Sequence, residues 1–314
     1  MKRLCVANGA LALIVVSANA QQVASPRLVG RPTFESGKGP VIAIDEAHQN
    51  THTFAAPAFR GLVELLQSDG YRVRPLTEGI TPASLTGVDL LVLSGPGGWV
   101  GPDAALSENE IADLLHWIRA GGSLLLILDH MPAPRNSGRL TAALGISNWH
   151  NGYAMVEIPD SAPVGPITYW RAEFLPAGLP SVGATGPAGG VGYQGPDALL
   201  AKHPITEGRT AEERVRRVAT FVGSAFQLPS GAEALLTMPG RAVSVMPAAT
   251  TGAVPSVTPE TPRTSVAGWS QGAVLKLGQG RVGLFGETGL FSGGPAADNR
   301  TFVLNVLHWL SGVL

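Results

Sequence analysis

The sequence predicts an α/β fold of the flavodoxin-like type: a doubly wound, mainly parallel sheet with helices on both faces and a late β-hairpin. Short apolar runs alternate with segments of helical periodicity over the first half of the chain, as in successive βαβ units. Some runs are apolar at every position, which is typical of strands covered on both faces. Polar clusters follow directly after such runs, at the sheet edge where open α/β sheets place their sites.

The first half of the chain supplies most of the predicted parallel strands. Strands are predicted over residues 41–45, 71–73, 89–93 and 123–128, with helices over 57–68 and from about 108 to Gly121-Gly122. Ser107 and Glu110 have the spacing of a capping box, which marks the start of the second helix. The strand over 123–128 is continuously apolar and is therefore predicted to be central.

The second half is less regular. Residues 131–208 are rich in Gly and Pro and predict a long excursion or a small subdomain packed over the sheet edge. Order returns over 214–221 and 234–238. Two alternating runs, 272–277 and 281–285, flank Gly278-Gln279-Gly280 and predict the hairpin, and a helix with an apolar stripe is predicted over 301–310.

Residues 1–20 have the features of a signal peptide. Lys2 and Arg3 precede an apolar run, and Ala18-Asn19-Ala20 has the small-x-small pattern of a cleavage site. The run is shorter than the ~20 residues that span a bilayer. We expect export to the periplasm or the extracellular space with cleavage near Ala20, and no transmembrane segment in the mature chain. An irregular lead-in over 21–39 and a single α/β domain over 40–314 would follow, the domain carrying the irregular insertion at about 131–208.

Charge and cysteine content exclude several classes of function. The 22 Lys and Arg residues nearly balance the 23 Asp and Glu residues, so the chain has no bulk electrostatic attraction for nucleic acid. A small-molecule substrate or ligand, or a protein partner, remains open. The only cysteine is Cys5, inside the predicted signal peptide. The mature chain is therefore expected to contain no disulfide, no thiolate nucleophile and no cysteine metal ligand.

Histidines and carboxylates cluster at the predicted strand ends. We expect these ends to face one crevice, because the carboxyl ends of parallel strands share one edge. The catalytic candidates are Asp45, His48, Asp129, His130 and Glu287. The candidates for substrate binding are Glu46, Asn50, Ser94 and Gly95. The candidate metal ligands are His48, His52, Asp129 and His130.

Two chemistries suit this set of groups. Neutral imidazoles and carboxylates ligate a divalent metal such as zinc, which lowers the pKa of bound water to about 7. Alternatively, a histidine poised by a carboxylate performs acid/base catalysis without a metal. Each residue also has a structural interpretation: Asp45 as a cap, Asn50 as a turn residue, and His130 as a core histidine bonded to a carbonyl.

Three other polar residues are assigned structural positions. Ser224 lacks the second glycine of a nucleophile elbow, which favours a hydrogen-bonding serine at a strand end. His116 and His308 lie on predicted amphipathic helices. We expect both histidines to be helix-face residues that are remote from the crevice.

Several segments together resemble the class I glutamine amidotransferase-like superfamily, in an exported branch of unknown function that lacks the catalytic cysteine. The segments, in chain order, are DEAHQNTHT, LLVLSGPGG, GGSLLLILDHMPAP, HPITEGR, GQGRVGLFGETGLFSGG and DNRTFVLNVLHWL. The resemblance covers nearly the whole mature chain and implies a flavodoxin-like sandwich. Some relatives are amidotransferases or peptidases, and others are non-catalytic accessory modules.

The departure from the enzymatic branch limits the chemistry. Amidotransferases carry a cysteine on a strand-to-helix elbow, whereas here the equivalent strand continues into Leu128-Asp129-His130. Thioester chemistry on glutamine is thereby excluded. The Ser94-Gly95-Pro96-Gly97-Gly98 turn resembles the oxyanion-hole turn of the family. Two hypotheses follow: an exported hydrolase acting on a small polar or carbohydrate-like substrate, or a non-catalytic ligand- or protein-binding module on a degenerate scaffold.

Overall fold

The computed structural model describes residues 29, 31–156, 173–174, 199–220, 222–247, 260–292 and 298–314. The predicted signal peptide, most of residues 21–30 and much of the 131–208 segment lie outside the described residues. No helix within the described ranges is long and apolar enough to cross a membrane.

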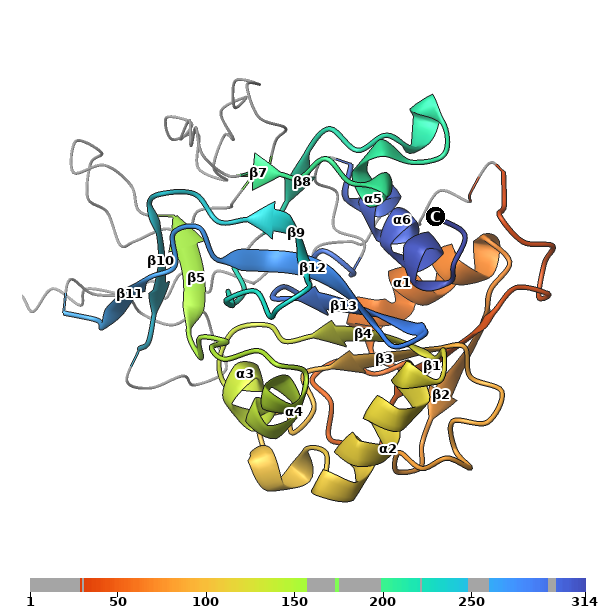
Figure 1. Ribbon diagram of the computed structural model, residues 1–314, viewed down its shortest axis with the longest axis horizontal. Coiled ribbons are helices and arrows are strands. Elements are labelled where there is room, and N and C mark those ends of the chain that lie inside the picture. Colours follow the sequence, from red (N-terminus) through yellow and green to blue (C-terminus); the bar gives the residue numbers. More distant parts are fainter. Residues whose placement is uncertain are drawn as a thin grey trace, which may run out of the picture.

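An eight-stranded sheet forms the centre of the protein (Figure 1). Its strands, in spatial order, are β2 (Arg72–Leu76), β1 (Val41–Asp45), β3 (Leu90–Ser94), β4 (Ser123–Ile127), β13 (Gly280–Phe285), β12 (Ser270–Leu277), β9 (Glu233–Thr237) and β7 (Leu199–Leu200). The run from β2 to β13 is parallel, and β12, β9 and β7 follow with antiparallel pairing. The predicted mainly parallel α/β sheet and its late hairpin, β12–β13, are confirmed.

The central strands are buried because helices cover both faces of the sheet. Helices α1 (Pro57–Ser68) and α6 (Asn299–Leu310) cover one face, and α2 (Glu108–Arg119) covers the other (Figure 1). Successive side chains of a strand point to opposite faces. Accordingly, Ile42 and Ile44 belong to the core beneath α1 and α6, whereas Ala43 belongs to the core beneath α2. Both faces of the strands are therefore sealed from water, and only the strand ends remain available for a site.

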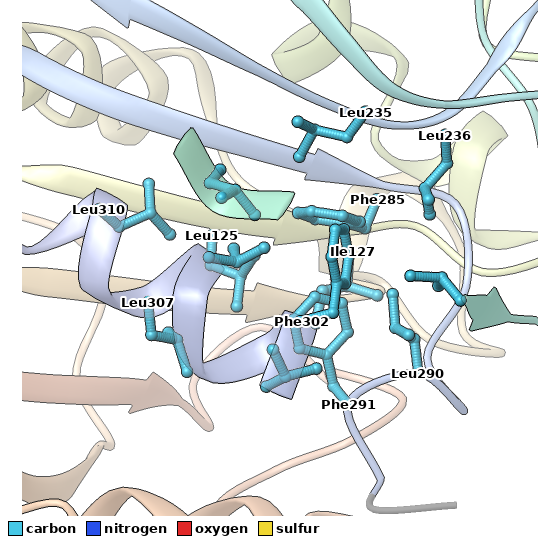
Figure 2. Close-up of a cluster of buried hydrophobic side chains, with 14 of the residues drawn as sticks. Leu125, Ile127, Leu235, Leu236, Phe285, Leu290, Phe291, Phe302, Leu307 and Leu310 are labelled. Carbon is cyan, nitrogen blue, oxygen red and sulfur yellow. The ribbon is translucent and has the colours of Figure 1, made fainter. Parts of the chain in front are cut away.

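The α6 side of the core is rich in aromatic residues. Phe302 of α6 packs edge-on against Phe285 of β13, with ring centroids 6.0 Å apart (Figure 2). Leu125 and Ile127 of β4 and Leu307 of α6 belong to the same cluster. Hence the last helix is fixed to the middle of the sheet rather than to its rim.

Local signals account for where the two longer early helices begin. Pro57 occupies the first turn of α1, where a missing N–H costs nothing. At α2 the predicted capping box is present: the Ser107 backbone N–H donates to the Glu110 carboxylate at 2.9 Å, and the Glu110 N–H donates to Ser107 Oγ at 3.4 Å. The shorter helices are α3 (Ala133–Asn136), α4 (Gly138–Ala143), α5 (Pro204–Glu207) and the 3₁₀ segments Pro102–Ala104 and Ala211–Glu213.

Two small antiparallel sheets accompany the main one. One contains β11 (Arg263–Ser265), β10 (Ala242–Val245) and β5 (Tyr153–Val156), and the other pairs β6 (Glu173–Phe174) with β8 (Val218–Ala219). The strand β5 falls within the segment predicted to be irregular. Its pairing partner β10 is distant in the chain, so local periodicity could not indicate it.

His308 lies on α6 and away from the crevice, as expected, but it is not at the surface. Its side chain is buried, and its Nε2 lies 2.7 Å from Asp69 Oδ2 and 2.9 Å from Thr33 Oγ1. The backbone N–H of Thr33 donates to the other oxygen of Asp69 at 2.7 Å. His308 thus links α6 to the end of α1 and to the segment before β1. In contrast, His116 is exposed on α2.

Candidate functional site

Three loops meet at the C-terminal edge of β1, β3 and β4. The Thr51 N–H after β1 donates to the Ser94 carbonyl at 3.0 Å, and the Gly97 N–H after β3 donates to the His48 carbonyl at 2.7 Å. Asn136, which follows β4, donates from Nδ2 to the Gly98 carbonyl at 2.8 Å. The chain passes from β1 to β2 on one side and then to β3 on the other side of β1, so the order of strand addition reverses between β1 and β3. Doubly wound sheets bind ligands at such switch points.

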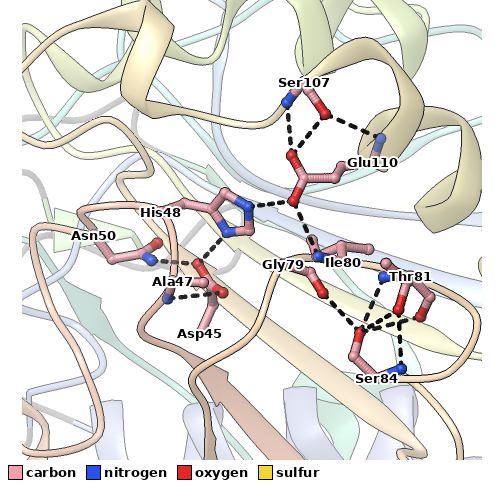
Figure 3. A network of polar contacts seen from close by, with 10 residues as sticks. All are labelled: Asp45, Ala47, His48, Asn50, Gly79, Ile80, Thr81, Ser84, Ser107 and Glu110. Carbon is pink, nitrogen blue, oxygen red and sulfur yellow. Dashed lines mark hydrogen bonds and ion pairs between the residues drawn. The ribbon is translucent and has the colours of Figure 1, made fainter.

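His48 is held between two carboxylates (Figure 3). Its Nδ1 lies 2.9 Å from Asp45 Oδ2, and its Nε2 lies 2.9 Å from Glu110 Oε1. Asp45 is buried and also accepts from Asn50 Nδ2. Glu110 accepts from the Ile80 N–H at 3.1 Å. The side chains therefore connect β1, the loop after β2 and the start of α2.

Glu110 was not among the predicted site residues. Its signal in the sequence was the capping box, which uses one carboxylate oxygen for Ser107. The other oxygen takes His48 and Ile80. Glu110 thus both caps the start of α2 and holds His48 in place. The contact with His48 exists only in the folded chain, so the sequence could not indicate it.

The two carboxylates keep His48 charged. Burial alone would lower the pKa of His48, but the hydrogen bonds and charges of Asp45 and then Glu110 outweigh it and raise the pKa to about 8. Burial alone would raise the pKa of Glu110, yet the bonds from Ser107 and His48 lower it to about 2. A cationic imidazole with both nitrogens engaged cannot accept a proton, so His48 is unsuited to be a general base near pH 7.

This ion pair makes stability depend on pH. The pKa of His48 is about 8 when folded against an ordinary 6.5, so its stabilisation is complete below pH 6.5 and is lost as the pH rises through 8. This difference between the folded and the ordinary pKa of His48 corresponds to about 2 kcal/mol of stability. We expect the unfolding free energy of the wild type, relative to His48→Ala, to fall by about this amount from about pH 6 to about pH 9 in urea titrations. Parallel pH profiles for the two proteins would contradict this assignment.

His52, Asp129 and His130 form a second group. Burial lowers the pKa of His52, the charge of Asp129 opposes this, and His130 adds to it, so His52 is neutral near pH 7. Asp129 accepts the His130 N–H at 2.7 Å and the Thr288 N–H at 3.0 Å. The His130 ring stacks on Tyr153 with centroids 4.3 Å apart. His48 instead takes Asp45 and Glu110 as its partners.

Other predicted residues are bound to nearby backbone. Glu287 is buried and accepts the N–H groups of Gly289 at 2.9 Å and Leu290 at 2.7 Å. Glu46 accepts the Ala55 N–H at 3.0 Å. The Ser224 hydroxyl donates to the Leu128 carbonyl at 2.6 Å, which is the structural role predicted for it. These contacts stabilise loops, and they occupy side-chain oxygens that would otherwise be available to bind or react with a substrate.

The predicted metal site is not assembled. Among the described residues, no group of three or more His, Cys, Asp or Glu side chains could hold a metal ion. The structure therefore does not bring His48, His52, Asp129 and His130 together as a set of metal ligands. The physical reason is that Asp45 and Glu110 occupy both nitrogens of His48, while Nδ1 of His130 is paired with the Met131 carbonyl at 2.8 Å.

The glycine turn after β3 does not present a free oxyanion hole. Gly95 has φ 61° and donates its N–H to the Ile127 carbonyl at 2.9 Å, while the Gly97 N–H is taken by His48. A Cβ at Gly98, where φ is 43°, would lie 2.3 Å from the Gln49 carbonyl oxygen, so only glycine fits there. The turn serves to pack the β1 and β3 loops together.

Five buried polar atoms at this edge have no hydrogen-bond partner among the described residues. We call them the edge cluster: Asn50 Oδ1, His52 Nδ1, Ser94 Oγ, Asn136 Oδ1 and Ser137 Oγ. Two further unpartnered atoms in the described ranges, on Asn305 and His308, belong to α6 instead. Asn50 and Ser94 were among the predicted substrate-binding candidates, whereas Asn136 and Ser137, which lie in the Gly- and Pro-rich region, were not.

Comparisons with known proteins indicate the fold. No family model matches the sequence, and no curated protein matches it. The N-terminal domain of mmIFT52 is structurally similar, with a TM-score of 0.56, 14% identity, and coverage of 86% of this chain and 97% of that domain. A ThuA-like protein from Parabacteroides merdae has a TM-score of 0.44 and 12% identity, covering 87% and 89%. The exo-beta-1,4-mannosidase Op5Man5 from an Opitutaceae bacterium has a TM-score of 0.39 and 13% identity, and the match covers 87% of this chain but 36% of the mannosidase.

Proposed function

We propose that the C-terminal edge of β1, β3 and β4 binds a small, neutral, hydroxyl-rich ligand. The edge cluster carries this proposal, because an unpaired buried polar atom costs about 1–3 kcal/mol. Native proteins pair such atoms with protein, water or ligand. A ligand whose hydroxyl groups reach these atoms would recover that free energy on binding.

The chemistry of the edge cluster favours hydroxyl groups. The amide orientations are set by their partners, since Asn50 Nδ2 faces a carboxylate and Asn136 Nδ2 faces a carbonyl, which leaves both amide oxygens as acceptors. The hydroxyl groups of Ser94 and Ser137 both donate and accept. A ligand hydroxyl matches either kind of atom. An anionic ligand at this edge would be repelled by the carboxylate of Asp129, whose charge acts on His52 of the edge cluster, so a neutral ligand is favoured.

Binding explains the contacts of this edge better than hydrolysis does. Of the proposed catalytic groups, His48 is charged and clamped, and Glu287 is engaged by backbone N–H groups. Asp129 also accepts two backbone N–H groups. These interactions rigidify the loops, which preorganises a binding site and lowers the entropy lost when a ligand is bound.

The serines provide a test of binding. Ser94→Ala and Ser137→Ala remove hydroxyl groups that have no partner in the described protein, so we expect unchanged or slightly higher melting temperatures. Each should weaken polyol binding about fivefold, because one ligand hydrogen bond is lost. Calorimetric titration with a panel of sugars, cyclitols and linear polyols measures this. Ser68→Ala, on α1, is the control. Wild-type protein that binds none of the panel, or variants that bind as tightly as wild type, would contradict the proposal.

Hydrolysis is the second candidate, favoured by one observation. His52 is neutral near pH 7, has an unpartnered Nδ1 and lies in the field of Asp129, as a metal-free general base requires. In a screen of glycoside and ester substrates we expect any genuine turnover to fall at least about 100-fold in His52→Gln. A turnover that is equal in wild type, His52→Gln and Asp129→Asn would remove this candidate.

A further inference from the structure

We propose that Trp99 is a stacking platform, so that the ligand of the edge is a ring-shaped polyol, such as a pyranose or a cyclitol, rather than a linear one. This inference rests on the proposed function and specifies its ligand class. Trp99 follows β3 and is 58% exposed, although exposing an indole to water forfeits the stabilisation that burial gives.

The backbone around Trp99 is fixed by hydrogen bonds. The Gly98 carbonyl accepts from Asn136 Nδ2 at 2.8 Å, and the Gly98 N–H donates to the Gly95 carbonyl at 3.1 Å. On the other side, the Val100 N–H donates to the Gly97 carbonyl at 3.0 Å. The indole is therefore carried on a braced turn, and its exposure is a feature of the folded loop rather than of a loose tip.

Trp99 adjoins both aromatic and polar groups of the edge. Its ring lies 6.5 Å from that of His130, which stacks on Tyr153 in turn. On the polar side, Asn136 bonds to the residue that precedes Trp99 and contributes Oδ1 to the edge cluster. An apolar surface thus borders unpaired hydrogen-bonding atoms.

This combination matches a ring that carries hydroxyl groups on its rim. The C–H groups on one face of a pyranose or cyclitol form a flat apolar patch that packs on an indole face. The hydroxyl groups on the rim then remain free to bond to the edge cluster. A linear polyol presents no such patch and loses more conformational freedom on binding.

The test compares rings with open chains. myo-Inositol and methyl glucoside are titrated against the linear polyols sorbitol and mannitol, using wild type, Trp99→Ala, Trp99→Phe and Val100→Ala. We expect wild type to prefer the rings, Trp99→Ala to weaken ring binding about tenfold with little change for linear polyols, and Trp99→Phe to retain most of the affinity. Val100 is 72% exposed but carries no ring on which a sugar could stack, so Val100→Ala should resemble wild type.

The outcomes separate the two proposals. If rings and linear polyols bind equally and Trp99→Ala changes neither, the platform is wrong, while weaker binding by Ser94→Ala would still support the polyol site. If Trp99→Ala and Val100→Ala impair ring binding to the same extent, the stacking proposal is wrong, and the two side chains form a general apolar patch of the kind that binds a protein partner. If wild type binds no polyol at all, both proposals fail.

Discussion

His48→Ala is expected to lower the free energy of unfolding by about 3 kcal/mol near pH 7, because it leaves the buried carboxylate of Asp45 and that of Glu110 without their cation. Removing one partner of a buried ion pair costs more than the pair contributes, since the remaining charge stays desolvated. Urea denaturation followed by circular dichroism measures the change.

The control for this variant is His116→Ala. His116 lies on α2, as Glu110 does, but it is exposed, so its removal should change stability by less than about 0.5 kcal/mol. A second variant, Glu110→Gln, keeps the shape of the side chain and removes only its charge. Equal stability of His48→Ala and His116→Ala would show that the two carboxylates do not depend on His48.

Phe302→Ala should cost about 4 kcal/mol, because it opens a cavity between α6 and the sheet. The Phe302 side chain is fully buried against Phe285, and close-packed interiors relax only partly around such a deletion. The midpoint of thermal or urea unfolding reports the loss.

Leu304 provides a matched position on the same helix. It is only partly buried, so Leu304→Ala should cost clearly less than Phe302→Ala. Similar losses for the two variants would mean that α6 is not held by the aromatic cluster under it.

Local patterns identified the parallel part of the fold because each βαβ unit carries its own signals. The helix predicted over 57–68 has the bounds of α1, and the apolar run after Gly122 became β4 at the centre of the sheet. Strands whose partners are distant were harder to predict. The strand β5 has no local hairpin, and its pairing with β10 depends on the folded chain.

The site was predicted only in part, because some of its residues carry a local signal in the sequence and others are brought in by distant parts of the chain. The polar tips of β1 and β4 were visible as breaks in apolar runs, which located Asp45, His48 and Asp129. Their partners were not visible, because Glu110 is hidden in a capping box. Asn136 and Ser137 lie within the Gly- and Pro-rich segment, where no periodicity marks which side chains are buried. Sequence patterns indicate which groups reach an edge, and packing decides which of them remain unpaired.

The position of β13 also affects how the protein folds. Ser123 of β4 pairs with Arg281 of β13, so a strand from near the end of the chain completes the interior of the sheet. Until that strand is synthesised, one edge of β4 lacks its hydrogen-bonding partner, and α6, which follows β13 in the chain, has not yet been made. Such distant pairing slows folding, because a long loop must close before its contacts contribute. We therefore expect the central sheet to remain incomplete on the ribosome until β13 has been made.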